Sequence, residues 1–413
     1  FTYTYANNPI AKYRELGVNT IISLNSSPWV QGKAWQRYVM LNKAIEGSIE
    51  EIVYVNQCGG QDDLIFDGSS FVVKKQAHRS APTLIHFCQD PFRNTYEVAD
   101  MSIHDALADS RSETYFANSF EPMLKDMLVL STRDYIHKNG FKEAVFGSSG
   151  GVDSAVVGMI LADALQPENV HSISMPTSIS SDHSKNDAEN LSKSLGIHYY
   201  TVPILHQKVI AEYNHDLADF FAGRTYQPVA DENIQARLRD VVLMHASNGV
   251  SGVLPIATGN KTEAAVGYYT HFDMCLGFAP LKDVYKMQVL AMAKADNRIP
   301  QNIWQKKPSA ELSENQTDEA SLLPYPILDA IVKAYIERYI SNFRDFSNWA
   351  LMAELEAVNN WTGTDNAHKD YRRIIKLIMI NEFKRWQTCV GTKVTPVAFG
   401  SGRRIPISKG WLP

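Results

Sequence analysis

The stretch Ser149–Ser154, which reads SGGVDS, constrains this sequence more than any other feature. It follows the apolar run Ala144–Phe146 and precedes the apolar segment 155–161, so the pattern predicts a strand, a tight loop and a helix. Glycines let a loop backbone approach an anion closely, and free N–H groups at a helix start favour negative charge. Serine hydroxyls can add donors, and Asp153 can hold a magnesium ion at bound phosphates. The loop therefore predicts a polyphosphate site, although Gly-Gly alone is also ordinary turn chemistry.

This loop contains no lysine, so it differs from the Gly-x-x-x-x-Gly-Lys-Ser/Thr loop of the common NTPases. It resembles the pyrophosphatase loop of the N-type ATP pyrophosphatases, which split ATP between its α and β phosphates and transfer AMP to a substrate. That group includes NAD synthetase, GMP synthetase, asparagine and argininosuccinate synthetases, and tRNA-modifying enzymes. The loop by itself does not choose among them.

Composition and charge exclude several other classes of protein. The chain has 413 residues, of which 45% are hydrophobic and 21% charged, enough for two or three domains with full cores. A net charge of −5 gives no basic excess, so we expect neither a nucleic-acid nor a membrane partner. No apolar run approaches membrane-spanning length. The widely spaced Cys58, Cys88, Cys275 and Cys389 argue against structural zinc and favour a reduced, cytoplasmic setting.

The first part of the sequence predicts an α/β region. Residues 18–24 and 51–56 are typical of strands, and a helix pattern runs from 32 to 45. Gly59-Gly60 and Asp67-Gly68 are turn signals, so Leu64–Phe66 and Ser70–Val73 are predicted to form a hairpin. The polar segment that follows predicts a linker.

Strands and helices alternate in the second part. A helix is predicted over 121–138, and the later part of the chain is mainly helical from 283 to 386. Alternation of this kind predicts βαβ units and a parallel sheet covered by helices, with a nucleotide at the carboxyl ends of the strands. The predicted strands are 142–147, 170–175, 198–203 and 252–257, and the helices between them include 154–165, 184–195 and 261–268.

A second polar segment, Thr258–Glu263 with the sequence TGNKTE, follows the apolar strand 253–257. The oxygens of Glu263 and Thr258 could bind a hard cation together with Asp153. Alternatively the segment is a helix cap, in which Thr258 or Asn260 caps and Glu263 completes a capping box. Both interpretations stay open for this segment alone.

Longer stretches resemble NAD synthetase, in the same order throughout residues 115–413. Segment 258–270 reads TGNKTEAAVGYYT, and segment 280–286 reads PLKDVYK. The match extends to 233–239 (NIQARLR) and 306–312 (KKPSAEL). The resemblance implies ATP-dependent amidation of deamido-NAD to NAD: ATP adenylates the nicotinate carboxylate, pyrophosphate leaves, and ammonia displaces AMP. It also implies bound Mg²⁺.

The beginning of the sequence resembles the later half of a nitrilase-type amidase domain. The matching segments are 25–28 (NSSP), 53–63 (VYVNQCGGQDD) and 66–70 (FDGSS). Such a domain precedes the synthetase in glutamine-dependent NAD synthetases, where a Glu-Lys-Cys triad releases ammonia from glutamine. The match does not include that triad, and Cys58 is interpreted as a small buried residue. Residues 1–413 are therefore expected to use free ammonia but not glutamine.

The two resemblances predict three parts: a partial nitrilase-like α/β sandwich over 1–85, a linker over 86–114, and an ATP-pyrophosphatase domain over 115–413. The last is expected to be an α/β domain of the adenine nucleotide alpha hydrolase type, with a parallel sheet flanked by helices. A homo-oligomer is expected by analogy with family members.

The resemblance also implies roles for individual residues. Asp153, Glu263 and Lys306 are the candidates for catalysis, and Asp153, Glu263 and Thr258 for binding magnesium. The expected ATP site comprises Ser149, Gly150, Gly151, Asp153, Ser154, Met175, Ser180, Ser181, Thr258, Lys306 and Ser309. The expected deamido-NAD site comprises Arg237, Asn260, Glu263, Asp273, Lys282, Lys393 and Arg404. Without the text around it, Lys306 would be interpreted as part of a solvated surface pair of lysines.

Two alternatives remain at this point. One is another ATP-pyrophosphatase amidotransferase, such as GMP synthetase, although that enzyme would carry a different type of glutaminase. The other is an RNA-modifying or nucleotide-sensing protein with the same fold. RNA modifiers are expected to show a basic face or additional cysteines, and this acidic chain shows neither.

Overall fold

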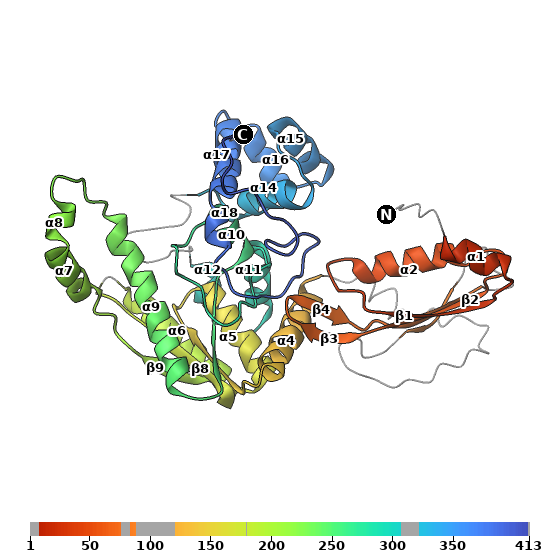
Figure 1. Ribbon diagram of the computed structural model, residues 1–413, viewed down its shortest axis with the longest axis horizontal. Helices are drawn as coiled ribbons and strands as arrows, with labels where there is room; N and C mark the ends of the chain where they lie inside the picture. The colour runs from red at the N-terminus through yellow and green to blue at the C-terminus, as the bar shows by residue number, and fades with distance from the viewer. Residues whose placement is uncertain (1–7, 76–82, 88–119, 179, 307–321, 412–413) are drawn as a thin grey trace. The chain divides into compact units, whose positions relative to one another are not determined.

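Figure 1 shows the computed structural model, which describes residues 8–75, 83–87, 120–178, 180–306 and 322–411. The predicted site residue Ser309 and the thiol of Cys88 lie outside these residues. The chain divides into two units, 1–131 and 132–413, and each is described by itself. Helix α4, Phe120–Lys138, runs across the boundary between them.

The first unit contains a sheet whose strand order is β1-β2-β5-β6. Strand β1 runs parallel to β2, whereas the other neighbouring strands pair antiparallel. Helices α1 and α2 lie along this sheet (Figure 1), and side chains of α2 pack with β2 and β5 in one apolar core. The elements are α1 (Pro9–Glu15), β1 (Thr20–Asn25), α2 (Lys33–Ala44), β2 (Glu51–Asn56), β5 (Phe71–Lys74) and β6 (Thr83–Phe87).

The predicted hairpin of Leu64–Phe66 with Ser70–Val73 is wrong. Strand β4, Leu64–Asp67, pairs antiparallel with β3, Cys58–Gln61, while β5 pairs with β2. The tight turn lies at Asp62, whose φ of 51° is a left-handed conformation that aspartate tolerates. The two glycines that were interpreted as a turn lie inside β3 instead.

Two smaller expectations for this unit also need correction. Cys58 is half-buried in β3, not fully buried, so the interpretation as a small core residue does not hold. The first residues of the predicted linker, His86 and Phe87, belong to strand β6. Linker residues 88–114 lie outside the described residues.

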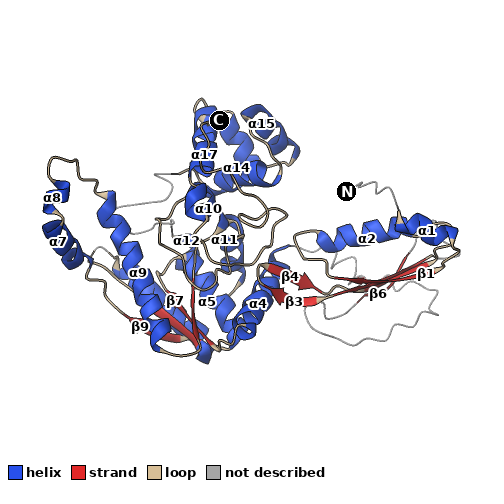
Figure 2. Ribbon diagram, viewed as in Figure 1, coloured by secondary structure: helices blue, strands red, loops and turns tan. Residues whose placement is uncertain are grey.

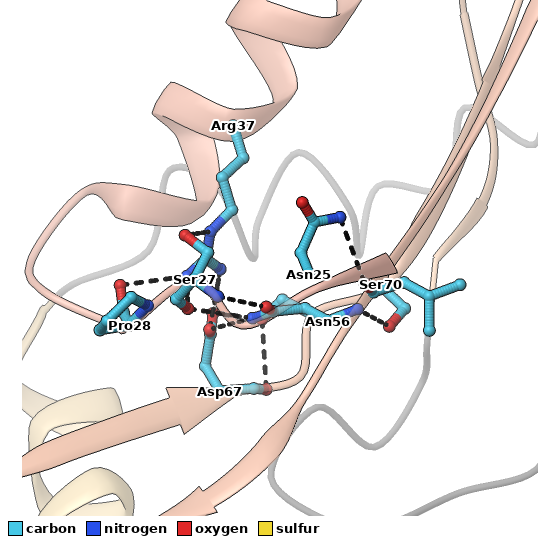
Figure 3. A network of polar contacts seen from close by, with 9 residues as sticks. Asn25, Ser27, Pro28, Arg37, Asn56, Asp67 and Ser70 are labelled. Atoms are coloured by element: carbon cyan, nitrogen blue, oxygen red, sulfur yellow. Dashed lines mark hydrogen bonds and ion pairs between the residues drawn. The ribbon is translucent and has the colours of Figure 1, made fainter. Parts of the chain in front are cut away.

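A buried ion pair organises the loop that follows β1 (Figure 3). Nη1 of Arg37 donates to both carboxylate oxygens of Asp67, at 2.8 and 2.9 Å, and the two side chains are 3% and 0% exposed. The amide of Asn56 and the hydroxyl of Ser69 also donate to this carboxylate. Arg37 also donates to the hydroxyl and carbonyl oxygen of Ser27 and to the carbonyl oxygen of Pro28. The charges are therefore compensated, and the loop after β1 is fixed to α2 and β4.

We expect Asp67→Asn to destabilise the first unit by about 3–5 kcal/mol, because it leaves the Arg37 guanidinium buried with an uncompensated charge. The matched control is Glu15→Gln, which removes an exposed carboxylate paired with Lys12 and should change stability by less than about 0.5 kcal/mol. Urea unfolding of residues 1–413 followed by tryptophan fluorescence measures both. Equal midpoints for the two variants would show that the buried pair does not stabilise this unit.

The second unit is built on a parallel sheet whose strand order is β10-β7-β8-β9. Figure 2 draws the strands of this sheet in red and labels β7 and β9. Its strands are β7 (Glu143–Gly147), β8 (Val170–Ser174), β9 (His198–Thr201) and β10 (Val253–Ile256). The helices between them are α5 (Val152–Leu165), α6 (Asp182–Leu195), α7 (His206–Asp216), α8 (Ala218–Phe221) and α9 (Val229–Gly249). Almost every residue of the apolar helix α5 is buried. The predicted fold class, a parallel sheet flanked by helices, is confirmed.

The remaining helices of this unit follow β10. Helices α10 (Lys261–Val266), α11 (Lys286–Ala295) and α12 (Gln301–Gln305) come first. Helices α14 (Tyr325–Glu337), α15 (Phe343–Met352), α16 (Glu356–Thr362), α17 (Ala367–Ile380) and α18 (Glu382–Arg385) then gather around a second apolar core (Figure 1). Helix α14 packs against both α10 and α11. None of the helices in the described ranges is long and apolar enough to cross a bilayer.

Candidate active site

A cavity of about 510 Å³ opens in the second unit, next to the loops that follow β7, β8 and β10. Most of the residues predicted from the sequence line it. They are Ser149, Gly151, Asp153, Met175, Ser180, Thr258, Asn260, Glu263, Asp273, Lys282 and Lys306. The cavity therefore brings together side chains that lie more than 150 residues apart in the sequence, from Ser149 to Lys306.

The loop after β7 has the geometry of an anion site. Gly150 has a φ of 74°, and a Cβ there would lie 2.3 Å from the carbonyl oxygen of Ser184, so only glycine fits. Helix α5 begins at Val152, and the side-chain-free residue before it, Gly151, supplies no cap. The first N–H groups of this 14-residue helix are thus available to a ligand rather than closed by a side chain.

The serines of this loop hold its shape. The hydroxyl of Ser149 accepts from the N–H of Gly151 at 3.2 Å, and the hydroxyl of Ser154 donates to the carbonyl of Gly151 at 3.0 Å. The two hydroxyls lie 3.2 Å apart. Ser154 and Gly150 do not themselves line the cavity. Their place in the structure is to shape the loop that does.

One lysine joins the two carboxylates that the sequence assigned to metal binding. Nζ of Lys286 contacts Oδ2 of Asp153 and lies 3.1 Å from Oε1 of Glu263. The Lys286 side chain is only 2% exposed, whereas each carboxylate is 19% exposed. Burial alone would lower the pKa of Lys286, but the charges of Asp153 and Glu263 outweigh it and raise that pKa above its ordinary value. The lysine therefore stays charged between two acids that border the cavity.

Asn260 combines the two interpretations that the sequence left open. Its Oδ1 accepts from the N–H of Glu263 at 3.0 Å, so it caps α10. Its Nδ2 donates to Oδ1 of Asp153 at 2.8 Å, so the cap also orients the acidic cluster. Glu263 turns toward Lys286. The hydroxyl of Thr258 lines the cavity and lies 3.9 Å from the sulfur of Met274.

The acidic cluster fits a metal ion only in a particular way. Within the described ranges, no three His, Cys, Asp or Glu side chains are grouped so as to hold a metal on their own. Mg²⁺, however, is usually bound by one or two carboxylates together with substrate phosphates and water. Asp153 and Glu263 meet at one point beside the anion loop, so they fit a magnesium ion shared with bound phosphates.

Lys286 is the functional residue that sequence reasoning missed. The sequence analysis placed it in a matching segment but gave it no role. The signal that could have found it is a lysine at the start of the apolar helix pattern 286–295, since a lysine is rarely buried without an acidic partner. The carboxylates Asp153 and Glu263 were already assigned to the site.

Lys306 lies at the other side of the loop after β7. It is half-buried at the end of α12, lines the cavity, and its Nζ donates to the hydroxyl of Ser184 at 2.5 Å. The carbonyl oxygen of the same serine lies against Gly150. Lys306 is therefore placed beside the anion loop, which does not fit the alternative of a solvated surface lysine.

Four of the predicted site residues lie elsewhere. Arg237 donates to the carbonyl of His271 and to the hydroxyl of Thr270. Arg404 stacks on Trp386. Ser181 caps α6, and neither it nor Lys393 lines the cavity. From the sequence alone, an arginine, lysine or serine that binds a ligand cannot be distinguished from one that contacts other residues of the protein.

The part of the cavity near α9 holds a second pair of acids. Burial raises the pKa of Asp240 to about 7, and the charge of the nearby Asp273 adds to the effect. Burial likewise raises the pKa of Asp273. The ammonium of Lys282, which also borders the cavity, donates to the carbonyl oxygen of Cys389. This part of the cavity therefore holds two acids that burial biases toward the neutral form, together with the ammonium of Lys282.

Together the fold and the site define an α/β unit in which the loop after the first strand of a parallel sheet has the geometry of a nucleotide-binding loop. The NAD synthase family model matches residues 124–388. The glutamine-dependent NAD(+) synthetase of Synechocystis is 37% identical over 99% of this chain and 70% of its own length. That of Acinetobacter baylyi is 36% identical over 98% and 71%. The chain belongs to the NAD synthase family, as the sequence predicted.

Solved structures agree with this assignment. The glutamine-dependent NAD+ synthetase from Acinetobacter baumannii in complex with ADP is 32% identical and superposes with a TM-score of 0.62, covering 97% of this chain and 70% of that one. The glutamine-dependent NAD(+) synthetase from Cytophaga hutchinsonii, 19% identical with a TM-score of 0.73, shares the fold. The alternatives of GMP synthetase and of an RNA-modifying protein are set aside by the family match.

The acid pair predicts a pH-dependent stability. Between pH 4 and 7 the folded state keeps the Asp240 proton that the unfolded chain loses, so the raised pKa makes stability fall as pH rises through this window. Asp240→Asn keeps an acceptor for the N–H groups of Met274 and Cys275 but cannot ionise. We therefore expect its melting temperature, relative to the wild type, to increase from pH 5 to pH 8. A difference that is the same at both pH values would contradict the raised pKa.

Proposed function

We propose that this chain is a carbon–nitrogen ligase that amidates deamido-NAD to NAD, using ATP and ammonia and releasing AMP and pyrophosphate. The observation that carries the proposal is the meeting of Asp153, Glu263 and Lys286 beside the uncapped start of α5, inside the unit that matches the NAD synthase family. Such a site can bind polyphosphate, and it borders the cavity of about 510 Å³ in which we place the substrates.

The chemistry explains why a polyphosphate site is needed. A carboxylate resists attack by ammonia because its oxygen is a poor leaving group. Adenylation of the nicotinate carboxylate converts this oxygen into part of AMP, which ammonia can displace, and the pyrophosphate group leaves in the first step. Negative charge develops on the departing pyrophosphate. Catalysis of that step is therefore mainly a matter of positioning and charge compensation.

The residues of the site divide this work. N–H groups of Val152 and the following residues at the start of α5 bind the β and γ phosphates, and Lys306 approaches them from the side of Ser184. Lys286 supplies a buried positive charge next to Asp153 and Glu263. Magnesium, when bound by these two carboxylates, supplies further charge compensation at the phosphates.

The two nucleotides then occupy different parts of the cavity. We place adenine near Met175 and Ser180 at the end of β8, with the phosphates in the loop after β7. Deamido-NAD is placed in the part lined by Asp273 and Lys282, so that its carboxylate faces the α phosphate. Asn260 and Glu263 also line the cavity, and we assign them to contacts with deamido-NAD.

The proposal extends to the organisation of the chain. Residues 1–85, together with His86 and Phe87 of β6, are assigned to part of a nitrilase-like glutaminase domain, 88–114 to a linker, and 115–413 to the synthetase domain. Ammonia is released from glutamine in relatives named glutamine-dependent NAD(+) synthetase, and the same source is proposed for the full-length protein. The wide spacing of the four cysteines supports a reducing, cytoplasmic setting, and family analogy supports a homo-oligomer.

Release of pyrophosphate, measured with deamido-NAD as the acceptor, tests the function. Residues 1–413 with Mg-ATP and ammonium salts should release pyrophosphate and form NAD, faster at higher pH because more free ammonia is present. Xanthosine monophosphate, the acceptor of GMP synthetase, should give neither product. Glutamine in place of ammonium should not support turnover by these residues. No pyrophosphate with deamido-NAD, or equal release with the other acceptor, would refute the proposal.

Asp153→Asn tests the role of the acidic cluster in the same assay. It keeps the shape of the side chain and removes its charge, so pyrophosphate release should fall by roughly 100-fold or more while the melting curve still shows a folded protein. The matched control is Asp163→Asn on the same helix, which weakens the ion pair with Arg298 away from the cavity and should retain wild-type activity. Near-normal activity of Asp153→Asn would remove this residue from the site.

A further inference from the structure

One buried carboxylate outside the cavity connects the two helices that carry Glu263 and Lys286. Asp329 of α14 is 8% exposed. Its Oδ1 accepts from the hydroxyl of Thr262, the second residue of α10, and its Oδ2 accepts at 2.8 Å from the N–H of Met287, the second residue of α11. A single side chain therefore binds the first turns of both helices.

The same contacts reach Lys286 from a second direction. The hydroxyl of Thr262 accepts from the backbone N–H of Lys286 at 3.0 Å while it donates to Asp329. One turn earlier on α14, the ring of Tyr325 lies 5.2 Å from the Lys286 ammonium. Glu263 is the neighbour of Thr262 in the chain, so one hydrogen-bonded group fixes the backbone from which both Glu263 and Lys286 extend.

Capping of α11 accounts for only one of the two contacts of this carboxylate. The Gln288 side chain accepts from the N–H of Tyr285 at 3.0 Å and Oδ2 of Asp329 from the N–H of Met287, whereas Oδ1 accepts from Thr262 on a different helix. The neighbours of Asp329 on α14 are the apolar core residues Leu328, Ala330 and Ile331. Burial raises the pKa of Asp329 to about 6, although the hydrogen bonds from Thr262 and Met287 act to lower it. Burying a carboxylate at this position therefore costs folding free energy.

We propose that Asp329 is a positioning residue for the adenylation reaction, acting through Thr262 to hold Glu263 and Lys286 where they meet Asp153. The inference rests on the proposed function, because it assigns Asp329 to that same site. In this proposal a C-terminal helix affects the reaction, because α14 holds the first turns of α10 and α11, from which Glu263 and Lys286 extend. A displacement of about 1 Å at a catalytic group is enough to slow a reaction about 100-fold.

The test compares two substitutions of Thr262 in the pyrophosphate assay. Thr262→Val keeps the shape but breaks the contact with Asp329, whereas Thr262→Ser keeps the hydroxyl. We expect kcat to fall about 10- to 100-fold in Thr262→Val and in Asp329→Asn, with KM for ATP changed by less than about threefold. Thr262→Ser should stay within about threefold of the wild type. The Asp163→Asn control should behave as the wild type.

The fall in kcat should also be non-additive. The double variant Thr262→Val/Asp329→Asn should be no slower than the slower single variant, since both break one connection. If both single variants melt earlier but keep the wild-type kcat, Asp329 is a structural residue only and the inference is wrong. If Asp329→Asn does not fold, the pair of Thr262 variants still decides, because equal kcat values for valine and serine overturn the proposal.

A second readout does not depend on activity. In the ligand-free protein, Thr262 and Asp153 are linked through Lys286, so the melting-temperature effects of Thr262→Val and Asp153→Asn should not add. Additive effects would contradict positioning through Lys286. If the wild-type protein makes no pyrophosphate from deamido-NAD and ATP, the proposed function is refuted instead. The melting temperatures of the two single variants and the double variant would still test whether Thr262 and Asp153 are coupled through Lys286.

Discussion

The contact of the Lys286 ammonium with two carboxylates is the interaction on which the rest of the site depends. Asp153 lies in the first turn of α5, Glu263 in the first turn of α10, and Lys286 begins α11, so three helix starts converge at one buried charge. Without the Lys286 ammonium, the carboxylates of Asp153 and Glu263 would repel each other at this distance. The lysine thus keeps the acids in place, beside the loop that binds phosphates, before a nucleotide arrives.

Two of the buried ion pairs, Arg37 with Asp67 and Lys286 with its two acids, differ in their exposure to a cavity. Arg37 and Asp67 in the first unit are enclosed, and surrounding polar groups use their hydrogen-bonding capacity (Figure 3). The acids that pair with Lys286 keep one side toward a cavity and remain partly exposed. The first arrangement fixes a loop. The second leaves the carboxylates of Asp153 and Glu263 partly exposed, so that they could bind a metal ion in addition to Lys286 when phosphates enter the cavity.

Sequence reasoning worked where local chemistry sets the structure. The apolar runs and glycines around Ser149–Ser154 determine a strand, a loop and a helix, and the parallel sheet follows from alternation. It failed for the hairpin, since Gly59-Gly60 imitates a turn while the turn forms at Asp62. It also missed Lys286 and Asp329, whose partners lie 23 to 133 residues away and become visible only when helices pack.

The most direct test of the account is a crystal structure of residues 1–413 with magnesium and a non-hydrolysable ATP analogue. The account predicts β and γ phosphates at the N–H groups that begin α5, a metal ion between these phosphates and the carboxylates of Asp153 and Glu263, and Lys286 still adjoining the cluster. Adenine should lie beside Met175. Phosphates bound elsewhere in the cavity, or an analogue that leaves the start of α5 without a ligand, would contradict it.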